Sequence, residues 1–417
     1  MNEEGGKRTR RLSAKKLTQQ PSTKQSASRD EFDFIEHIRR RTLKRQATPQ
    51  DESRQREASA SSLIPHPSSL IHGIGDDAAV LRQARASGDL VVTADMLVEE
   101  IDFRRGYTPP HMLGHKALAV SLSDIAAMGA RPLWALLSVG VPHDVWQTDF
   151  LEQFYEGFDA LALEHRVTLV GGDVSRTPAH VVVDSIVLGE VARGRALLRA
   201  GARAGDRIYV TGTLGGASAG LRLLEGGARL KANRTGSAHL DANRTGSTGK
   251  STRDRVRRAR ERLMLRQLRP TPRLAWGAWL CEQRLATSMI DLSDGLSSDL
   301  AHLCRESGVG AKIDASRIPS DPSIAQARLD DDAAHALPQT TDALSLALHG
   351  GEDFELLFTV RPRRAARLPD ELDGVRLTEI GEVTNDAARR VMLLREGRAP
   401  EVLRPAGFAH FKRSARK

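Results

Sequence analysis

The chain lacks the features that mark several common classes of protein. Only 4% of its 417 residues are aromatic, and its two cysteines, Cys281 and Cys304, do not have the spacing of metal ligands. No apolar stretch approaches the roughly 18 residues of a membrane-spanning helix, and the basic, polar start of the chain does not resemble a secretory signal peptide. We therefore expect a cytoplasmic protein with reduced cysteines and no membrane partner.

Familiar motifs of nucleotide chemistry are also missing. The sequence contains neither the Walker motif Gly-x-x-x-x-Gly-Lys-Ser/Thr nor the kinase motif His-Arg-Asp. His72, His115, His165, His302 and His349 show no paired spacing with one another of the kind that binds a metal ion. If the protein transfers phosphate, it uses neither of the two common scaffolds.

The positive charge of the chain is not spread over a folded face. The net charge is +9, but residues 1–30 carry +5 and residues 250–266 carry +6, which leaves the rest of the chain slightly acidic. Charge confined to two segments argues against a basic catalytic groove, so we expect no nucleic acid as a required partner. The alternative from a different functional class is a protein without enzymatic activity that binds RNA or DNA through these two segments.

The length of the chain suits two domains of ordinary size. Residues 1–29 form a basic tail without apolar content, which predicts disorder. We expect an N-terminal domain over 30–202, interrupted by a polar linker at 46–70, and a C-terminal domain over 203–417. The second domain contains a predicted surface insertion at 226–260, where Ala-Asn-Arg-Thr-Gly-Ser occurs at 232–237 and again at 242–247.

Apolar periodicity predicts strands and helices in alternation through both domains. A short helix is expected from Asp30, and the folded body is expected to begin near Leu70. Expected strands are 78–82, 89–94, 134–141, 167–170, 180–192, 287–291, 311–314, 356–361, 377–383 and 390–395, with a further strand starting at 207. Expected helices are 148–165, 215–224, 273–285 and 296–306, with a further helix starting near 110 and some helix after 252. The pattern indicates an α+β protein of two α/β-type domains.

Six short acidic motifs, each set among glycines or small residues, stand out. They are Gly-Ile-Gly-Asp-Asp (73–77), Thr-Ala-Asp (93–95), Ser-Leu-Ser-Asp (121–124), Gly-Gly-Asp (171–173), Ile-Asp-Leu-Ser-Asp-Gly (290–295) and Gly-Gly-Glu-Asp (350–353). Most follow or interrupt apolar runs, which places the carboxylates at strand ends or turns where a fold can bring them together. Converging carboxylates suit Mg²⁺, and glycine turns present N–H groups to phosphate. The combination predicts a phosphoryl-transfer site.

Each motif also has a purely structural interpretation. Asp95 suits a helix cap as well as a metal ligand, and Gly-Gly-Asp is an ordinary turn. Asp124 lies in a helix that looks buried, so it needs either a cation or an ion pair with Lys116, two helical turns earlier. Asp291 and Asp294 flank a strand-to-helix switch, where they can hold Mg²⁺ beside phosphate or cap the following helix.

The order and wording of the motifs resemble the thiamine-monophosphate kinase family. This family belongs to a superfamily with aminoimidazole-ribonucleotide synthetase, selenophosphate synthetase and the hydrogenase maturation dehydratase. The resemblance covers about 30–411 without the linker and the insertion. It rests on Gly-Ile-Gly-Asp-Asp-Ala-Ala-Val, Lys-Ala-Leu-Ala-Val-Ser-Leu-Ser-Asp-Ile-Ala-Ala-Met-Gly-Ala, Gly-Arg-Ala-Leu-Leu-Arg, Ile-Asp-Leu-Ser-Asp-Gly-Leu and Gly-Gly-Glu-Asp-Phe-Glu-Leu.

The resemblance implies ATP-dependent phosphorylation of thiamine monophosphate to thiamine diphosphate, by direct in-line transfer with several Mg²⁺ ions and no catalytic side chain. It implies an N-terminal sheet domain that binds ATP and Mg²⁺ and pairs in a homodimer, and a C-terminal α/β sandwich domain. The implied metal ligands are Asp77, Thr93, Asp95, Asp124, Asp173, Asp291 and Asp294. The implied ATP contacts are Tyr155, Gly172, Asp173, Arg199 and Ser293, and the implied contacts of thiamine monophosphate are Asp102, Glu352 and Phe408.

Other members of the superfamily are the alternative within the same class. Selenophosphate synthetases carry a reactive Cys or selenocysteine near the N-terminus, whereas the first cysteine here is Cys281. The hydrogenase maturation relative ends in a cysteine, whereas this chain ends in Ser-Ala-Arg-Lys. Both differences favour the kinase.

Overall fold

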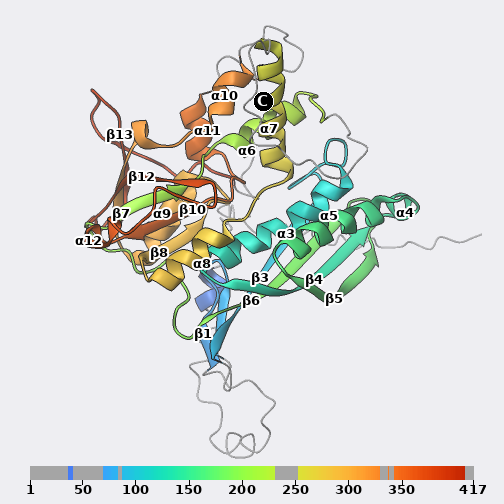
Figure 1. Cartoon of the computed structure of the whole chain (residues 1–417), viewed down its shortest axis with the longest axis horizontal. Coiled ribbons are helices and arrows are strands. Elements are labelled where there is room, and N and C mark those ends of the chain that lie inside the picture. The colour runs from blue at the N-terminus through green and yellow to red at the C-terminus, as the bar shows by residue number, and fades with distance from the viewer. Residues whose placement is uncertain are drawn as a thin grey trace, which may run out of the picture.

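The computed structural model of the chain describes residues 36–40, 69–82, 87–230, 252–328, 337 and 342–408. The predicted tail 1–29, the start of the short helix at Asp30, the linker up to residue 68 and the two repeats of the insertion lie outside the described residues. Residues 36–40 are helical, and the first strand begins at Leu70. Two bodies lie side by side, each built on one sheet (Figure 1).

The N-terminal body is a six-stranded sheet with the order β1-β2-β3-β6-β4-β5. Its strands are β1 (Leu70–His72), β2 (Ala79–Arg82), β3 (Gly88–Val98), β4 (Arg131–Val141), β5 (Thr168–Arg176) and β6 (Val182–Ala192). Only β4 and β5 pair in parallel, because helices α4 (His143–Trp146) and α5 (Phe150–Glu164) form the crossover between them. Alternate side chains of the long strands, such as Val91, Leu137 and Val187, are buried against α3 (Pro110–Ala127) and α5.

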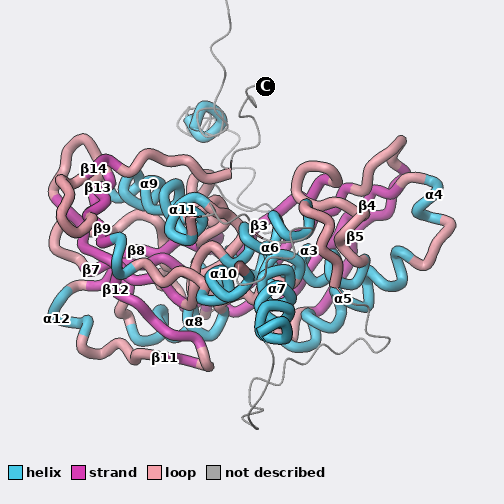
Figure 2. Tube along the Cα trace, turned by 90° about the horizontal axis from the view of Figure 1, so that it is seen from above, coloured by secondary structure: helices cyan, strands magenta, loops and turns pink. Residues whose placement is uncertain are grey.

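Apolar side chains also line the other face of this sheet. The described helices of the domain lie on the opposite side (Figures 1 and 2). Met96 and Trp134 are 59% and 43% exposed, and Val92, Ile186 and Leu188 are half-buried. β5 forms the outer edge, and nearly all its residues are exposed. This sheet therefore presents one open, partly apolar face and one open edge.

One motif lies in a different element from the one expected. We predicted a strand that ends at Val170, with Gly171-Gly172-Asp173 after it, either beside a phosphate or as an ordinary turn, but these residues lie in the middle of β5. The prediction is wrong because a register irregularity, opposite Ala135 and Leu136, lets the strand continue through the two glycines. Gly172 has φ +153°, and its Cα lies so close to Leu137 that a Cβ would be 1.8 Å from the Leu137 carbonyl oxygen.

The C-terminal body is a sheet with the order β14-β13-β9-β12-β7-β10-β8, and β11 pairs with β12. Its strands are β7 (Arg207–Thr211), β8 (Ala286–Asp291), β9 (Gly310–Asp314), β10 (Leu356–Val360), β11 (Glu371–Leu372), β12 (Val375–Thr384), β13 (Val391–Leu394) and β14 (Glu401–Val402). Helices α9 (Leu296–Ser307) and α11 (Ala343–His349) pack on one face, and α8 (Leu274–Gln283) packs on the other. The sheet thus has helices on both faces, and the predicted α+β class with two α/β-type domains is confirmed.

Helix α3 lies between the two bodies. Fifteen of its eighteen residues are buried, and its last turn, with Ala126 and Ala127, belongs to the same apolar cluster as Trp276 and Phe358 of the C-terminal body. A helix that is apolar on all sides is stable only inside a core. Its sequence of small and apolar residues is therefore a consequence of burial by both domains.

A third group of helices packs above the C-terminal sheet. Helices α6 (Gly216–Glu225), α7 (Thr252–Leu268) and α10 (Pro322–Ala327) share an apolar cluster that includes Leu223, Leu263 and Ile324. The prediction of a surface insertion over 226–260 is wrong at its C-terminal end, because Val256 and Ala259 of α7 are buried. Seven arginines in α7 obscure its apolar side in the sequence.

The short elements were not predicted from the sequence. They are α4, α10, α11, α12 (Pro362–Ala365), η2 (Ala315–Arg317), β1, β11 and β14. The helices among them have fewer than two full turns, which is too short for a helical apolar period to be recognised, and the strands among them have only two or three residues. Among the helices within the described residues, none combines the length and the apolar character needed to cross a membrane.

Helices α3 and α5 approach each other closely at two glycines. A Cβ at Gly157 would lie 1.7 Å from the His111 carbonyl oxygen, and a Cβ at Gly114 would lie 1.8 Å from the Phe154 carbonyl oxygen. Neither backbone can move without separating the helices, since both are packed against the sheet.

We predict that Gly157→Ala lowers the free energy of unfolding by about 1–3 kcal/mol, because overpacking outweighs the roughly 1 kcal/mol gain in helix propensity. Urea unfolding measures the change. The control is Gly106→Ala, where a Cβ meets nothing within 4 Å, and we expect a change below about 0.5 kcal/mol. Equal stability of the two variants would contradict the prediction.

Candidate functional site

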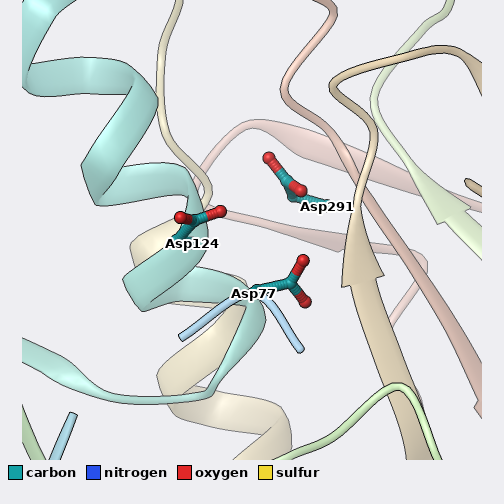
Figure 3. Close-up of side chains that lie close together, drawn as sticks. All are labelled: Asp77, Asp124 and Asp291. Carbon is teal, nitrogen blue, oxygen red and sulfur yellow. The ribbon is translucent and has the colours of Figure 1, made fainter. Parts of the chain in front are cut away.

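Three carboxylates from distant parts of the chain meet between the two bodies. Asp77, Asp124 and Asp291 each offer an oxygen atom, and these atoms lie within 4.8 Å of one another. Asp77 lies in the loop between β1 and β2, Asp124 in the last turn of α3, and Asp291 at the end of β8. Figure 3 shows the three side chains converging on one space. We call them the carboxylate cluster.

Local sequence places each side chain at this point. The loop at 73–77 crosses from one strand to the next with Gly75 at φ +119°. β8 is buried throughout its last four residues, so the chain emerges at Asp291 and turns before α9. Asp124 follows Ala117, Ala119, Ser121 and Ser123, small residues that let α3 approach both domains closely. The cluster therefore lies where a buried helix meets a strand end and a glycine turn.

The cluster is electrostatically unfavourable without a cation. Burial, and next the charge of Asp77, raise the pKa of Asp291 to about 8. Burial raises the pKa of Asp77 to about 6 although Arg199 opposes the shift, and it raises the pKa of Asp124 well above its usual value, helped by Asp95 and Asp291. Burial also raises the pKa of Asp95 to about 6. A divalent cation would compensate these charges.

Unpaired atoms agree with a cation site. Asp77 Oδ2 and Asp95 Oδ2 are buried and have no hydrogen-bond partner. Buried polar atoms normally have partners, and an exception calls for an explanation such as a bound ion. Hard carboxylate oxygens in a cluster without His or Cys suit Mg²⁺. The residues present therefore fit the group that the sequence predicts.

Neighbouring side chains orient the cluster. Thr93 donates to Asp124 Oδ2, and Ser123 Oγ donates to Asp291 Oδ2 at 2.7 Å. Arg199 Nε donates to Asp77 Oδ1 at 3.1 Å, which leaves Oδ2 for another ligand. Of these residues, Ser123 was missed by the sequence analysis, and its place beside Asp124 in a buried helix was the available signal.

Arg199 is also fixed through its backbone. Its N–H donates to Asp76 Oδ2 at 3.1 Å, and its carbonyl oxygen accepts from Ser307 Oγ at 2.9 Å. Asp76, which the sequence analysis left without a role, thus ties the Asp77 loop to the segment that carries Arg199. The guanidinium group is held beside the cluster.

A second group of predicted residues meets at the loop before α9. The Ser293 carbonyl oxygen accepts from the Glu352 N–H at 2.8 Å, and the Asp294 carbonyl oxygen accepts from the Phe408 N–H at 3.1 Å. Asp299 accepts from the N–H groups of Asp294 and Gly295, at 3.2 and 3.0 Å. The carboxylate that caps α9 is thus Asp299. The loop brings together three segments that were predicted to bind different parts of the reactants.

Glu352 lies in a charged contact across the domain boundary. Its Oε1 is 2.6 Å from Lys116 Nζ of α3, and its Oε2 accepts from Gln267 Nε2 of α7. Lys116 therefore pairs with Glu352, and the alternative in which it neutralises Asp124 is wrong. Helix α3 carries both the cluster residue Asp124 and the partner of Glu352.

Four predicted residues lie apart from the carboxylate cluster. Tyr155 is half-buried in α5, beside Phe154. Asp102 accepts from the Val98 N–H at 2.8 Å within the turn after β3. Gly172 and Asp173 lie in β5, at the far edge of the sheet from β3. The structure thus separates them from Asp77, Asp124 and Asp291.

The position of Asp173 follows from the sheet register. Asp173 pairs with Ser138, Ser138 with Asp184, and Asp184 with Met96, the residue after Asp95. Three strand spacings separate the ends of this row, which is about 14 Å. The side chain of Asp173 points to the open face with Met96, and that of Asp95 points to the helix-covered face.

Comparison with known proteins places most of the chain in one family. The models described as AIR synthase related protein, N-terminal domain, and AIR synthase related protein, C-terminal domain, match residues 75–191 and 203–393. The thiamine-monophosphate kinase of Escherichia coli (strain K12) is 38% identical over 346 residues, which are 81% of this chain and 91% of that protein.

Solved structures agree. The chain superposes on AaThiL complexed with AMPPCP and TMP with a TM-score of 0.66 and 27% identity, over 95% of this chain and 100% of that one. The thiamine-monophosphate kinase of Stenotrophomonas maltophilia K279a gives a TM-score of 0.60 at 36% identity, over 83% and 96% of the two chains.

We predict that Asp291→Asn raises the free energy of unfolding of the metal-free protein by about 1–3 kcal/mol. At pH 7.5 a buried carboxyl group with a pKa of about 8 has to take up a proton on folding or stay charged beside its neighbours, and Asn avoids both costs. Urea unfolding in the presence of a chelator at pH 7.5 measures the change. Asn keeps the oxygen that accepts from Ser123.

The matched control is Asp206→Asn. Asp206 is equally buried, but it accepts from Thr287 Oγ1 at 2.7 Å and from the Arg203 N–H at 3.0 Å, so its replacement should destabilise. If Asp291→Asn destabilised the metal-free protein as much as this control, the cluster would not be repulsive.

Proposed function

Because the chain belongs to the thiamine-monophosphate kinase family, we propose that it phosphorylates thiamine monophosphate to thiamine diphosphate, with ATP as the donor. The γ-phosphoryl group passes directly in line to the acceptor phosphate, with several Mg²⁺ ions bound. The resemblance found in the sequence is confirmed by the relatives and by the two family models. One of the similar solved structures is a complex with AMPPCP and TMP.

The observation that carries the proposal is the carboxylate cluster. Asp77, Asp124 and Asp291 converge there, and one oxygen each of Asp77 and Asp95 is buried without a partner. Thr93 and Asp95 lie on β3, where Thr93 donates to Asp124, and Asp294 lies in the turn after β8. These six residues would hold Mg²⁺. Bound Mg²⁺ neutralises the charge that builds up when two polyanions are brought together.

The side chains of this protein contribute to the reaction by positioning the two reactants. The acceptor is a phosphate, which is already anionic, so no strong general base is needed, and the cluster contains no histidine. Ser293 and Arg199 would contact ATP at the loop before α9 and beside Asp77. Glu352 and the 45% exposed Phe408 would hold the acceptor, since an organic cation suits a carboxylate and an aromatic face. Asp102 would be a further contact.

The remaining ATP and metal residues support a homodimer. Asp173, on the outer edge of the sheet, is too far from Asp95 to share an ion with it in one chain. The open face carries Trp134 and Met96, which a second copy would bury. In a symmetric pair, Tyr155, Gly172 and Asp173 of one subunit would complete the site of the other.

Thiamine monophosphate, ATP and Mg²⁺ incubated with the protein should give thiamine diphosphate and ADP in equal amounts, detected by chromatography. Free thiamine should be a poor acceptor, because the site is proposed to bind an existing phosphate through metal ions. Absence of thiamine diphosphate, or equal efficiency with thiamine, would overturn the proposed function.

The dimer is tested by mixing two inactive variants. We expect Asp124→Asn and Asp173→Asn each to lower kcat by at least about two orders of magnitude. If Asp173 serves the partner's site, a mixed dimer contains one fully native site and one doubly altered site. An equimolar mixture, after dissociation and reassociation, should recover about a quarter of the native activity.

The control is a mixture of Asp124→Asn with Asp291→Asn. Both changes lie in the same cluster, so every site of a mixed dimer keeps one altered residue and no activity returns. Failure of the first mixture to recover activity would contradict a site shared between subunits.

A further inference from the structure

A buried ammonium group reaches from one domain into the other. Lys116 is 1% exposed, in the middle of α3, and its Nζ lies 2.6 Å from Glu352 Oε1 on the loop between α11 and β10. Removing one partner from a buried ion pair leaves an uncompensated charge and is strongly unfavourable. Such a contact needs a reason beyond general stability, because an apolar pair would cost less.

The Glu352 side chain is held at both oxygens. Gln267 Nε2 donates to Oε2 from α7, and Gln267 is itself 4% exposed. The side chain of Glu352 keeps 28% of its surface exposed. Lys116 and Gln267 therefore bind the carboxylate from the interior of the protein, and its other side is open to solvent.

The backbone of Glu352 is fixed as well. Its φ is +65°, a strained conformation for a non-glycine residue that persists only where the surroundings enforce it. The enforcing contact is the 2.8 Å hydrogen bond from its N–H to the Ser293 carbonyl oxygen. Strain of this kind is common at functional sites, and here it accompanies the fixed orientation of the Glu352 carboxylate.

Helix α3 sets the distance between this carboxylate and the cluster. Lys116 and Asp124 are eight residues apart, which is about 12 Å along a helix axis. Both residues lie in a helix buried by the two domains, so the separation is rigid. A molecule that reaches from the cluster to Glu352 has to match this length.

From these contacts we propose that Lys116 is a positioning residue for the acceptor: it orients Glu352 against α3, and Gln267 assists on the other oxygen. The proposal rests on the proposed function, in which Glu352 binds thiamine monophosphate. Lys116 acts through Glu352 and serves the acceptor, while the ATP side of the site does not depend on it.

The test compares Lys116→Met, Glu352→Gln and the double variant by steady-state kinetics. Met keeps an unbranched stem and removes the charge. Lys116→Met should raise the KM for thiamine monophosphate by about tenfold or more and change the KM for ATP by less than about threefold. In the Glu352→Gln background, the same change should add less than about twofold, because there is no carboxylate left to orient.

The matched control is Lys312→Met. Lys312 also pairs with a glutamate, since its Nζ lies 2.7 Å from Glu382 Oε1. This pair, however, lies on the exposed surface of β9 and β12. Its kinetic constants should equal those of the native protein. An equal rise in both KM values for Lys116→Met, or independent effects in the double variant, would overturn the proposal.

Gln267→Met keeps the proposal testable if Lys116→Met does not fold. This variant removes the hydrogen bond to the other oxygen of Glu352. It should raise the KM for thiamine monophosphate by about threefold or more and leave the KM for ATP unchanged. An unchanged KM for thiamine monophosphate would overturn the proposal. The outcomes separate the two claims. A native protein that makes no thiamine diphosphate overturns the proposed function, whereas an active native protein with unaffected variants overturns only the role of Lys116.

Discussion

The burial of several like charges at one point is the constraint on which the rest of this structure depends. Asp77, Asp124 and Asp291 come from a loop, a helix and a strand, and each carries a raised pKa because burial penalises its charge. A fold that merely needed stability would place apolar side chains there. Three elements from two domains instead bring carboxylates together, so the charge is what the arrangement is built to hold.

Helix α3 is the element that makes this arrangement rigid. It is buried by the sheet of one domain and by α8 and the sheet of the other, and three of its polar residues contact acids outside the helix. Ser123 contacts Asp291, Asp124 joins the cluster, and Lys116 contacts Glu352. The N-terminal domain therefore reaches the residues of the C-terminal domain through one helix, whose small side chains allow the close approach.

The sequence predicts this site as far as local pattern reaches. Asp77, Asp124 and Asp291 could be identified because glycine turns and apolar runs indicate where strands and helices end. The position of Asp173 could not, because it depends on the register of β5 against β4, which an irregularity alters. Helix α7 was partly missed because arginines dominate its sequence, although Val256 and Ala259 are buried. Pairing across domains, as for Lys116 and Glu352, has no signature in a linear pattern.

The contrast between two sets of buried acids shows which of them are structural. Glu355 is fully buried, yet its pKa is lowered: burial would raise it, but Arg273 binds both its oxygens at 2.6 Å, and Arg266 and Thr211 complete the shell. Asp353 accepts from the N–H groups of Gly215 and Ala217, although burial still raises its pKa to about 6. These acids have their partners within the chain and hold α7 and α6 to the sheet. The cluster and Asp95 are buried or half-buried, but Arg199 is the one cation of the described residues that bonds to them, and two oxygen atoms have no partner. The acids of the motif Gly-Gly-Glu-Asp-Phe-Glu thus have different roles according to the hydrogen-bond donors around them. In the carboxylate cluster, the shortage of donors indicates a binding site for a ligand.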